Sequence, residues 1–290
     1  MNWLLRYYVP ALSLLGFAGF CAALGTGLDP SIAVAIVSVI ALASATALER
    51  RRPYRRAWNN DAGDLKTDLT SAALLAAIVD PALKLLAPLL VLWLYTALEA
   101  GRPQSPVGLW VEIPIVLLMA ELGKYWAHRI HHGLPSAWWL HALHHGSTRL
   151  YALNGLRFHP LNYAINFALG ILPLMLLGAS SESIAAYLAL TQPIVLVQHA
   201  NIALRHGRLN AILSTPEAHR LHHSTRPHEG NANYGNAILL WDHAFGTYRR
   251  HGSFADDAQV GLFESSRTYP STAGYWSQLA SMFKPSCCAA

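Results

Sequence analysis

The stretch HRIHHGLPSAWWLHALHH, residues 128–145, contains two copies of the pattern His-x-x-His-His. A third copy, HRLHH, follows at residues 219–223. A lone histidine is usually an ordinary packing or surface residue, but three repeated triplets among 15 histidines are not expected by chance. The repetition therefore indicates a metal-binding site.

Helical geometry explains this spacing, because residues i, i+3 and i+4 share one face of a helix. We expect two triplets to project together and one pair to do the same: His141, His144 and His145; His219, His222 and His223; His128 and His132. Imidazole suits iron, zinc, copper and nickel, and the spacing does not choose among them. The count exceeds what one tetrahedral zinc can use, which indicates two metals or one metal with crowded surroundings.

The composition is that of a membrane protein. Hydrophobic residues make up 53% of the chain and charged residues only 13%, whereas soluble domains carry about 25% charged residues. The net charge of +5 could suggest a nucleic-acid partner, but five arginines lie in one short loop at residues 50–56. Such a loop is typical of the cytoplasmic side of a membrane protein. We find no nucleic-acid-binding motif and expect no such partner.

Apolar runs predict the order of the membrane segments. Residues 9–24, 31–48, 69–98 and 107–126 are candidate spanning helices, and residues 162–179 and 183–197 are two shorter runs that form a membrane hairpin. Asp80 and Lys84 interrupt the third run at i, i+4 spacing and can form an ion pair. An interfacial helix is expected to end near Asp80 and Pro81, with the spanning part after it.

The fold class is therefore an all-α integral membrane bundle, with about four spanning helices, a membrane hairpin and a cytoplasmic histidine-rich cap. We expect three parts: membrane helices and the basic loop at residues 1–106, a catalytic domain at 107–250 and a tail at 251–290. If the arginine loop is cytoplasmic, one crossing leads out and residues 107–126 lead back, and the hairpin leaves and returns. All candidate ligands then meet at the cytoplasmic membrane face.

Few chemistries fit such a site. A zincin protease is unexpected because the chain has no His-Glu-x-x-His motif. A metal transporter would place its ligands near the bilayer midplane, and haem needs only one or two axial histidines. A metal-dependent oxygenase acting on a membrane-dissolved substrate fits best.

The order and spacing of several motifs resemble the fatty acid hydroxylase superfamily, also called the sterol desaturase family, over residues 107–248. The motifs are YWAHRIHH at 125–132, WWLHALHH at 138–145, LRFHP at 156–160, QHANI at 198–202, TPEAHRLHH at 215–223, NYG at 233–235 and WDHAFGTY at 241–248. The resemblance implies a non-haem di-iron enzyme that uses O2 to hydroxylate or desaturate lipids. It also implies an external electron donor, such as a cytochrome b5, a ferredoxin or a reductase.

The resemblance carries the family's ligand positions onto nine histidines of this chain. They are His128 and His132, then His141, His144 and His145, then His199, and finally His219, His222 and His223. His159 is an additional candidate ligand, although some branches of the family have no histidine there. His131 is extra to the family pattern and is expected beside a ligand or facing solvent. His206, His228, His243 and His251 are expected not to be ligands.

Five further residues are candidates for orienting the ligands, and no catalytic group is expected beyond the ligands themselves. Glu121 stands two turns before the first box where the family usually has Asp, and it can orient an imidazole. Asn154 stands where the family often has Thr, and Arg157 is retained. Asn233 and Asp242 can either hydrogen-bond ligand histidines or form turns.

The predicted function is membrane-bound hydroxylation of a lipid or sterol-like substrate by two iron ions and O2. A desaturase with the same site is the alternative within the enzyme class. A histidine-rich membrane protein that binds or transports metal without redox turnover is the alternative outside it.

Overall fold

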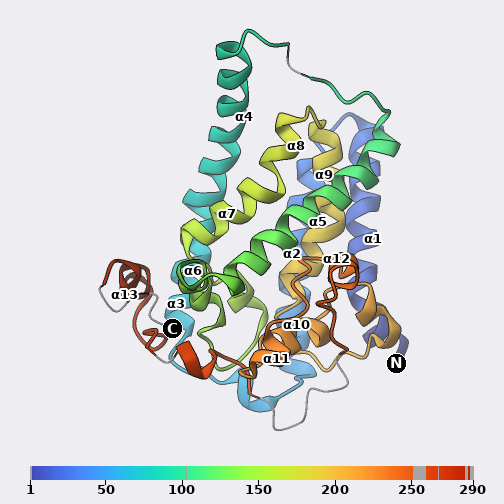
Figure 1. The fold of residues 1–290 in the computed structure, drawn as a ribbon. Helices are drawn as coiled ribbons and strands as arrows, with labels where there is room; N and C mark the ends of the chain where they lie inside the picture. The colour runs from blue at the N-terminus through green and yellow to red at the C-terminus, as the bar shows by residue number, and fades with distance from the viewer. Residues whose placement is uncertain (1, 102, 251–258, 267, 285–286, 288–290) are drawn as a thin grey trace.

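The computed structural model describes residues 2–101, 103–250, 259–266, 268–284 and 287. The described residues form helices and three isolated β-bridges but no strand, so the predicted all-α class is confirmed. Long helices stand side by side in one part of the molecule, and short helices and loops gather at one end of them (Figure 1).

The long helices agree with the predicted apolar runs and extend them at the ends. They are α1 (Asn2–Thr26), α2 (Ser31–Arg51), α3 (Leu65–Leu74), α4 (Asp80–Ala97), α5 (Leu109–Gly133) and α9 (Ser181–Val197). The predicted hairpin corresponds to α7 (Pro160–Gly170), α8 (Leu172–Leu176) and α9. Ser180 caps α9 by accepting a hydrogen bond from the Ser183 amide.

The expected helix end near Asp80 and Pro81 is wrong. A π-helical turn (Leu75–Val79) joins α3 to α4, and the chain remains helical over 33 residues. Pro81 lies directly after the π-helical turn, inside this continuous helix, where its missing amide proton removes one main-chain hydrogen bond. The predicted ion pair is present, with 2.6 Å between Lys84 Nζ and Asp80 Oδ2.

Within the described residues, three helices are long and apolar enough to cross a membrane, namely residues 5–26, 31–51 and 65–97. They identify a membrane protein. The predicted fourth span, α5, is 25 residues long but carries Glu112, Glu121 and Lys124, which set it apart in composition.

Short elements form the cap, by which we mean residues 135–160, 199–250 and 259–284. Its helices include α6 (Pro135–His145), α10 (Pro216–His222), α11 (Pro227–Gly230), α12 (Leu240–Ala244) and α13 (Tyr275–Ala280). Its 3-10 turns include Ala152–Leu156, Gly207–Ala211, Glu264–Ser266 and Ser281–Phe283. The helices α6, α10 and α11 start with proline, whose fixed φ suits the first helical position.

Two tryptophans of the WWLHALHH motif fasten the C-terminal part of the cap to α6. The Trp138 indole donates to Ser266 Oγ at 2.7 Å, and the Trp139 indole donates to Ser281 Oγ at 2.9 Å. Phe263 stacks on Trp138 with ring centroids 4.9 Å apart. The second histidine triplet therefore stands on a rigid, buried helix.

Two glycines allow the long helices to approach closely. A Cβ on Gly123 of α5 would lie 2.0 Å from the Leu169 carbonyl oxygen of α7, and one on Gly16 of α1 would lie 2.2 Å from the Ala189 oxygen of α9. His128 and His132 follow Gly123 on α5 by five and nine residues. The close approach of α5 to α7 therefore also fixes where this histidine pair lies along the bundle.

We predict that Gly123→Ala destabilises the protein by about 1–3 kcal/mol, because α5 and α7 must separate to admit the methyl group. Thermal unfolding in detergent should show the midpoint lowered by several degrees. Gly25→Ala is the matched control, because a Cβ there meets no atom within 4 Å. An unchanged midpoint for Gly123→Ala would show that the contact is not tight.

Candidate metal centre

The nine predicted histidines lie in two adjacent groups at the cap end of the bundle. The five-histidine group consists of His128 and His132 of α5, His141 and His145 of α6, and His222 of α10. The four-histidine group consists of His144 of α6, His199 just after α9, and His219 and His223 at α10. Within each group, one ligand atom from every residue lies within 4.8 Å of all the others.

The second and third His-x-x-His-His triplets are each divided between the two groups, so the expectation that their members project together is wrong, whereas His128 and His132 do share one group. From α6, His141 and His145 join the five-histidine group and His144 joins the other. From α10, His219 and His223 join the four-histidine group and His222 joins the other. Helical geometry gives the reason: positions i+3 and i+4 are separated by about 100° around the axis, on opposite sides of position i.

The two groups are in direct contact. The imidazoles of His145 and His223 stack with ring centroids 4.1 Å apart, and those of His141 and His144 lie 5.1 Å apart. Two ions bound in these groups would therefore be neighbours within one centre.

In the five-histidine group, oxygen acceptors fix the tautomer of four imidazoles. His128 Nδ1 donates to the Tyr234 carbonyl and His222 Nδ1 to the Ala232 carbonyl, both at 2.8 Å. His141 Nδ1 donates to Asn162 Oδ1 at 2.9 Å, and His132 Nδ1 to Asn231 Oδ1 at 3.1 Å. With the proton on Nδ1, each Nε2 presents its lone pair to the group, and the described residues offer these Nε2 atoms no hydrogen-bond partner.

In the four-histidine group, the Nε2 atoms face one another. His199 Nε2 lies 3.2 Å from His144 Nε2 and 2.9 Å from His219 Nε2. His144 and His199 both carry their proton on Nδ1, where it is donated to the Arg157 carbonyl and to Asn154 Oδ1. Their facing Nε2 atoms are thus two lone pairs, an arrangement that repels unless a cation lies between them.

Burial keeps these imidazoles neutral. It lowers the pKa of His144 to about 3, and it lowers the pKa values of His141, His145, His222 and His223 well below the ordinary histidine value. Neutral imidazole is the form that ligates metals. Together with the converging lone pairs, this donor set fits two metal ions held by nitrogen alone.

Two of the five predicted supporting residues contact ligand imidazoles. Asn154 Oδ1 accepts the His199 Nδ1 proton at 2.8 Å. Arg157 accepts from His144 at 3.2 Å through its main-chain carbonyl, while its guanidinium pairs with Asp68.

In the described part of the chain, the other three predicted supporting residues hydrogen-bond to loops rather than to imidazoles, so Asn233 and Asp242 follow the turn-forming alternative. Glu121 accepts from the amides of Ala237 and Ile238 and from the Tyr187 hydroxyl. Glu121 therefore holds the segment that follows NYG rather than an imidazole. Asp242 accepts from the Tyr234 and Gly235 amides, and Asn233 forms a turn at φ 55°.

These loop contacts act on the centre indirectly. Asp242 holds the Tyr234 amide at 2.8 Å, and the carbonyl of the same residue accepts the His128 proton. Glu121 ties down the next residues of that loop. The two carboxylates therefore position a backbone acceptor.

The candidate ligand His159 lies in neither group. Its Nδ1 accepts the Leu161 amide at 3.1 Å and caps α7. His131 is buried beside the ligands: its Nδ1 donates to the Ala127 carbonyl and its Nε2 accepts from Asn162. Of the histidines expected not to be ligands, His206, His228 and His243 lie outside both groups, and His251 lies outside the described residues. His206 is fully buried against Glu217 and is not an ordinary loop histidine.

Sequence reasoning missed Asn162, Asn231 and the carbonyls of Ala232 and Tyr234. Asn162 stands two residues after the LRFHP motif, and Asn231 stands two residues before NYG, so proximity to a motif was the available signal. A backbone carbonyl leaves no signal in the sequence, because every residue has one.

The part of the chain that contains the two histidine groups is also the part that matches known proteins. Residues 113–247 match the fatty acid hydroxylase family model. The ornithine lipid hydroxylase OlsE of Rhizobium tropici is 34% identical over 217 residues, which cover 73% of this chain and 64% of that protein.

Alkylglycerol monooxygenases are also similar. The Danio rerio protein is 30% identical over 134 residues, which cover 46% of this chain and 30% of its own length. The Homo sapiens protein is 28% identical over 134 residues, which cover 45% of this chain and 29% of its own length. The chain thus spans less than two thirds of these relatives. No solved structure matches it significantly.

The family match contains all nine imidazoles of the two groups and agrees with the motifs that resemble this family. Residues 113–247 are thus a fatty acid hydroxylase domain.

Proposed function

We propose that the protein is a membrane-bound non-haem di-iron oxygenase that hydroxylates a lipid, using O2 and an external electron donor. The observation that carries the proposal is the pair of adjacent imidazole groups with converging Nε2 lone pairs. All nine histidines that the family resemblance carried over are in these groups, and we propose them as the iron ligands.

Two bound irons would supply the reductive activation of O2 that inserting oxygen into an unactivated C–H bond requires. Hydroxylation consumes O2, two electrons and two protons, and releases one water. The chain's own residues hold the ligand protons on Nδ1 and shield the centre. Phe158 stacks on His144 with ring centroids 4.3 Å apart, and Tyr234 lies edge-on to His128 at 5.6 Å.

The position of the centre suits a substrate dissolved in the membrane. The 18 residues of α4 correspond to about 27 Å of helix, close to the hydrocarbon thickness of about 30 Å. Asp80, at the start of α4, then marks the membrane boundary on the cap side. Phe158 and Tyr163 link this boundary to the centre: Tyr163 donates to Asp80 at 3.0 Å and contacts Phe158.

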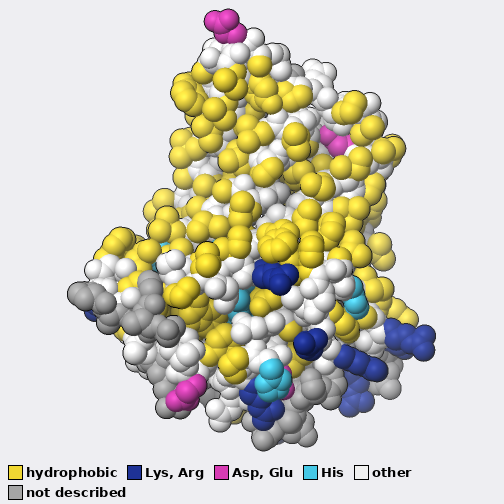
Figure 2. Space-filling view, viewed as in Figure 1, with side chains coloured by type: hydrophobic (Ala, Val, Ile, Leu, Met, Phe, Trp, Pro, Cys, Tyr) yellow, Lys and Arg dark blue, Asp and Glu magenta, His cyan; other side chains and the backbone are white. Residues whose placement is uncertain are grey.

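The charge distribution supports a cytoplasmic cap. Apolar side chains cover the bundle, and Lys and Arg side chains gather around the cap end on the face shown in Figure 2. The arginine loop contacts the cap directly, through a bridge between Pro53 and Ile202. Under the positive-inside rule, the metal centre faces the cytoplasm, α5 is a fourth span and α7 to α9 form the membrane hairpin.

The named relatives guide the substrate class. One is an ornithine lipid hydroxylase and others are alkylglycerol monooxygenases. We propose a membrane lipid with a polar headgroup, and a sterol-like substrate ranks second. A desaturase would use the same centre. Metal transport is less favoured, because both groups lie at helix ends. A cytochrome b5, a ferredoxin or a reductase would supply the electrons.

We predict that replacing both His144 and His222 by Ala abolishes product and bound iron, because each group loses a ligand. Iron should be measured in purified protein by elemental analysis. His228→Ala is the exposed control and should retain full iron, as should His159→Ala. Product formation in the double variant would refute the centre described here. Purified wild-type protein that holds only zinc and consumes no O2 with a reductant would favour the metal-binding or transport alternative.

We predict that lipid mass spectrometry of a host with and without the gene reveals a lipid that has gained one oxygen atom. The added atom should come from isotopically labelled O2. A product that has instead lost two hydrogen atoms would identify the desaturase alternative.

We predict that the two ends of the bundle differ in accessibility from outside the cell. In a variant whose three cysteines are replaced by Ser, Asn60→Cys marks the cap end and Gly101→Cys the opposite end. A membrane-impermeant maleimide should label Gly101→Cys in intact cells and Asn60→Cys only after permeabilisation. The reverse pattern would place the metal centre outside the cytoplasm.

A further inference from the structure

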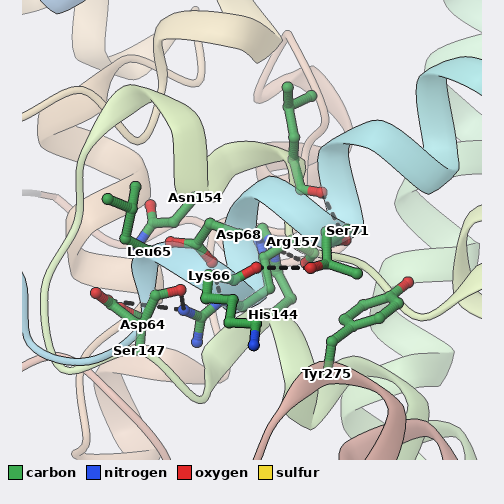
Figure 3. A network of polar contacts seen from close by, with 12 residues as sticks. Asp64, Leu65, Lys66, Asp68, Ser71, His144, Ser147, Asn154, Arg157 and Tyr275 are labelled. Atoms are coloured by element: carbon green, nitrogen blue, oxygen red, sulfur yellow. Dashed lines mark hydrogen bonds and ion pairs between the residues drawn. The ribbon is translucent and has the colours of Figure 1, made fainter.

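A buried carboxylate of α3 lies outside the matched hydroxylase segment yet reaches the metal centre. Asp68 is 0% exposed and pairs with the guanidinium of Arg157, which is 1% exposed. Figure 3 shows this pair beside His144, with Asp64 and Ser147 close by. Burying an ion pair is expensive, and in some proteins such a pair is retained because it fixes a particular structure.

The pair acts on a loop that supplies acceptors to two imidazoles of the four-histidine group. The Arg157 carbonyl accepts the His144 Nδ1 proton at 3.2 Å. At the other end of the loop, the Tyr151 hydroxyl donates to Asp68 Oδ2, and the Tyr151 amide donates to Asn154 Oδ1. The same Asn154 oxygen accepts the His199 Nδ1 proton at 2.8 Å. Asp68 therefore holds both ends of the segment that aims His144 and His199.

Neighbouring contacts reinforce the attachment of this loop to the α3 region. Arg149 donates to Asp64 Oδ1 at 2.7 Å from Nη2, and the Arg149 carbonyl accepts from Asn154 at 2.7 Å. Ser71 of α3 donates to the Leu156 carbonyl and accepts the Phe158 amide, both at 2.9 Å. The loop can shift only if these buried contacts break together.

The five-histidine group takes its oxygen acceptors from elsewhere. Asn162 belongs to α7, and Asn231, Ala232 and Tyr234 belong to the segment after α11. The α3 contacts thus serve one group and not the other.

We propose that Asp68 is a positioning residue for the metal of the four-histidine group alone, acting through Arg157 and Tyr151 on His144 and His199. The proposal rests on the proposed function, because it requires two bound metals. Supporting partners of ligand histidines typically change metal affinity by about 10–100-fold. Loosening the α3 contact should therefore release one metal faster and leave the other unaffected.

The test measures iron release from full-length protein in detergent, loaded anaerobically with Fe(II), into a coloured ferrous chelator. In Asp68→Asn, one of the two iron equivalents should leave about 10–100-fold faster, and the other should leave at the wild-type rate. Tyr151→Phe should accelerate the release of the same iron equivalent by a smaller factor, because this substitution removes one hydrogen bond and no charge.

Two variants serve as controls. Glu112→Gln alters a buried carboxylate at the opposite end of the bundle, where it accepts from the Ser180 amide at 3.0 Å, and both irons should leave at the wild-type rate. Asn231→Ala removes the acceptor of His132 and should accelerate the other equivalent. Combining Asp68→Asn with Asn231→Ala should then accelerate both.

Equal acceleration of both irons by Asp68→Asn, or no acceleration, would overturn the positioning role. If thermal unfolding shows that Asp68→Asn does not fold, Tyr151→Phe decides, and wild-type release of both irons from it would overturn the role. Wild-type protein that does not bind two irons would overturn the proposed function instead.

Discussion

The hydrogen bond from an imidazole Nδ1 to an oxygen acceptor is the interaction on which the structure of the centre depends. It fixes the tautomer and the orientation of the ring, and so decides where the Nε2 lone pair points. Six of the nine imidazoles have such a bond, to carbonyls of Tyr234, Ala232 and Arg157 or to side-chain amides of Asn231, Asn162 and Asn154. Without these acceptors, buried neutral rings could rotate or exchange tautomers.

Except for Asn162 of α7, the acceptors lie in loops and short turns, and buried carboxylates hold these segments. Glu121 and Asp242 fasten the segment around Tyr234, and Asp68 fastens the segment from Tyr151 to Arg157. The buried carboxylates thus act on the imidazoles through the acceptor segments and do not contact the rings themselves. This arrangement keeps the surroundings of the imidazoles free of acids while it still defines their orientation.

The sequence predicted the helical class, the apolar segments and eight histidines of the repeated triplets, because each of these depends on residue type and spacing. The ninth histidine, His199, was carried over from the family resemblance. The sequence also predicted that the histidines meet at one end, since helix direction alternates along the chain. It did not predict how the triplets divide, because i+3 and i+4 look equivalent until neighbouring helices fix the rotation of α6 and α10. Glu121 was misplaced for a similar reason: a helical face identifies a direction but not the partner across it.

Long-range partners were the least predictable part of the site. Asp68 lies 89 residues before Arg157 in sequence, and nothing in its local pattern distinguishes it from a solvent-facing helix residue. Backbone acceptors such as the Ala232 carbonyl have no residue preference at all. Both kinds of partner depend on how distant segments pack in the folded chain, which no local pattern encodes.

The histidines of α6 and α10 are divided between the two groups, so the helical repeat itself sets the arrangement of the ligands in the centre. On α6 and α10, the residues at i and i+4 face one group and the residue at i+3 faces the other, so the division between the groups follows from the helical repeat rather than from loops. Changes of length in the connecting loops do not alter this division of the α6 and α10 histidines. One residue inserted between His141 and His144 would turn His144 and His145 by about 100° around the helix axis relative to His141, which makes the interior of the motif intolerant of changes in length.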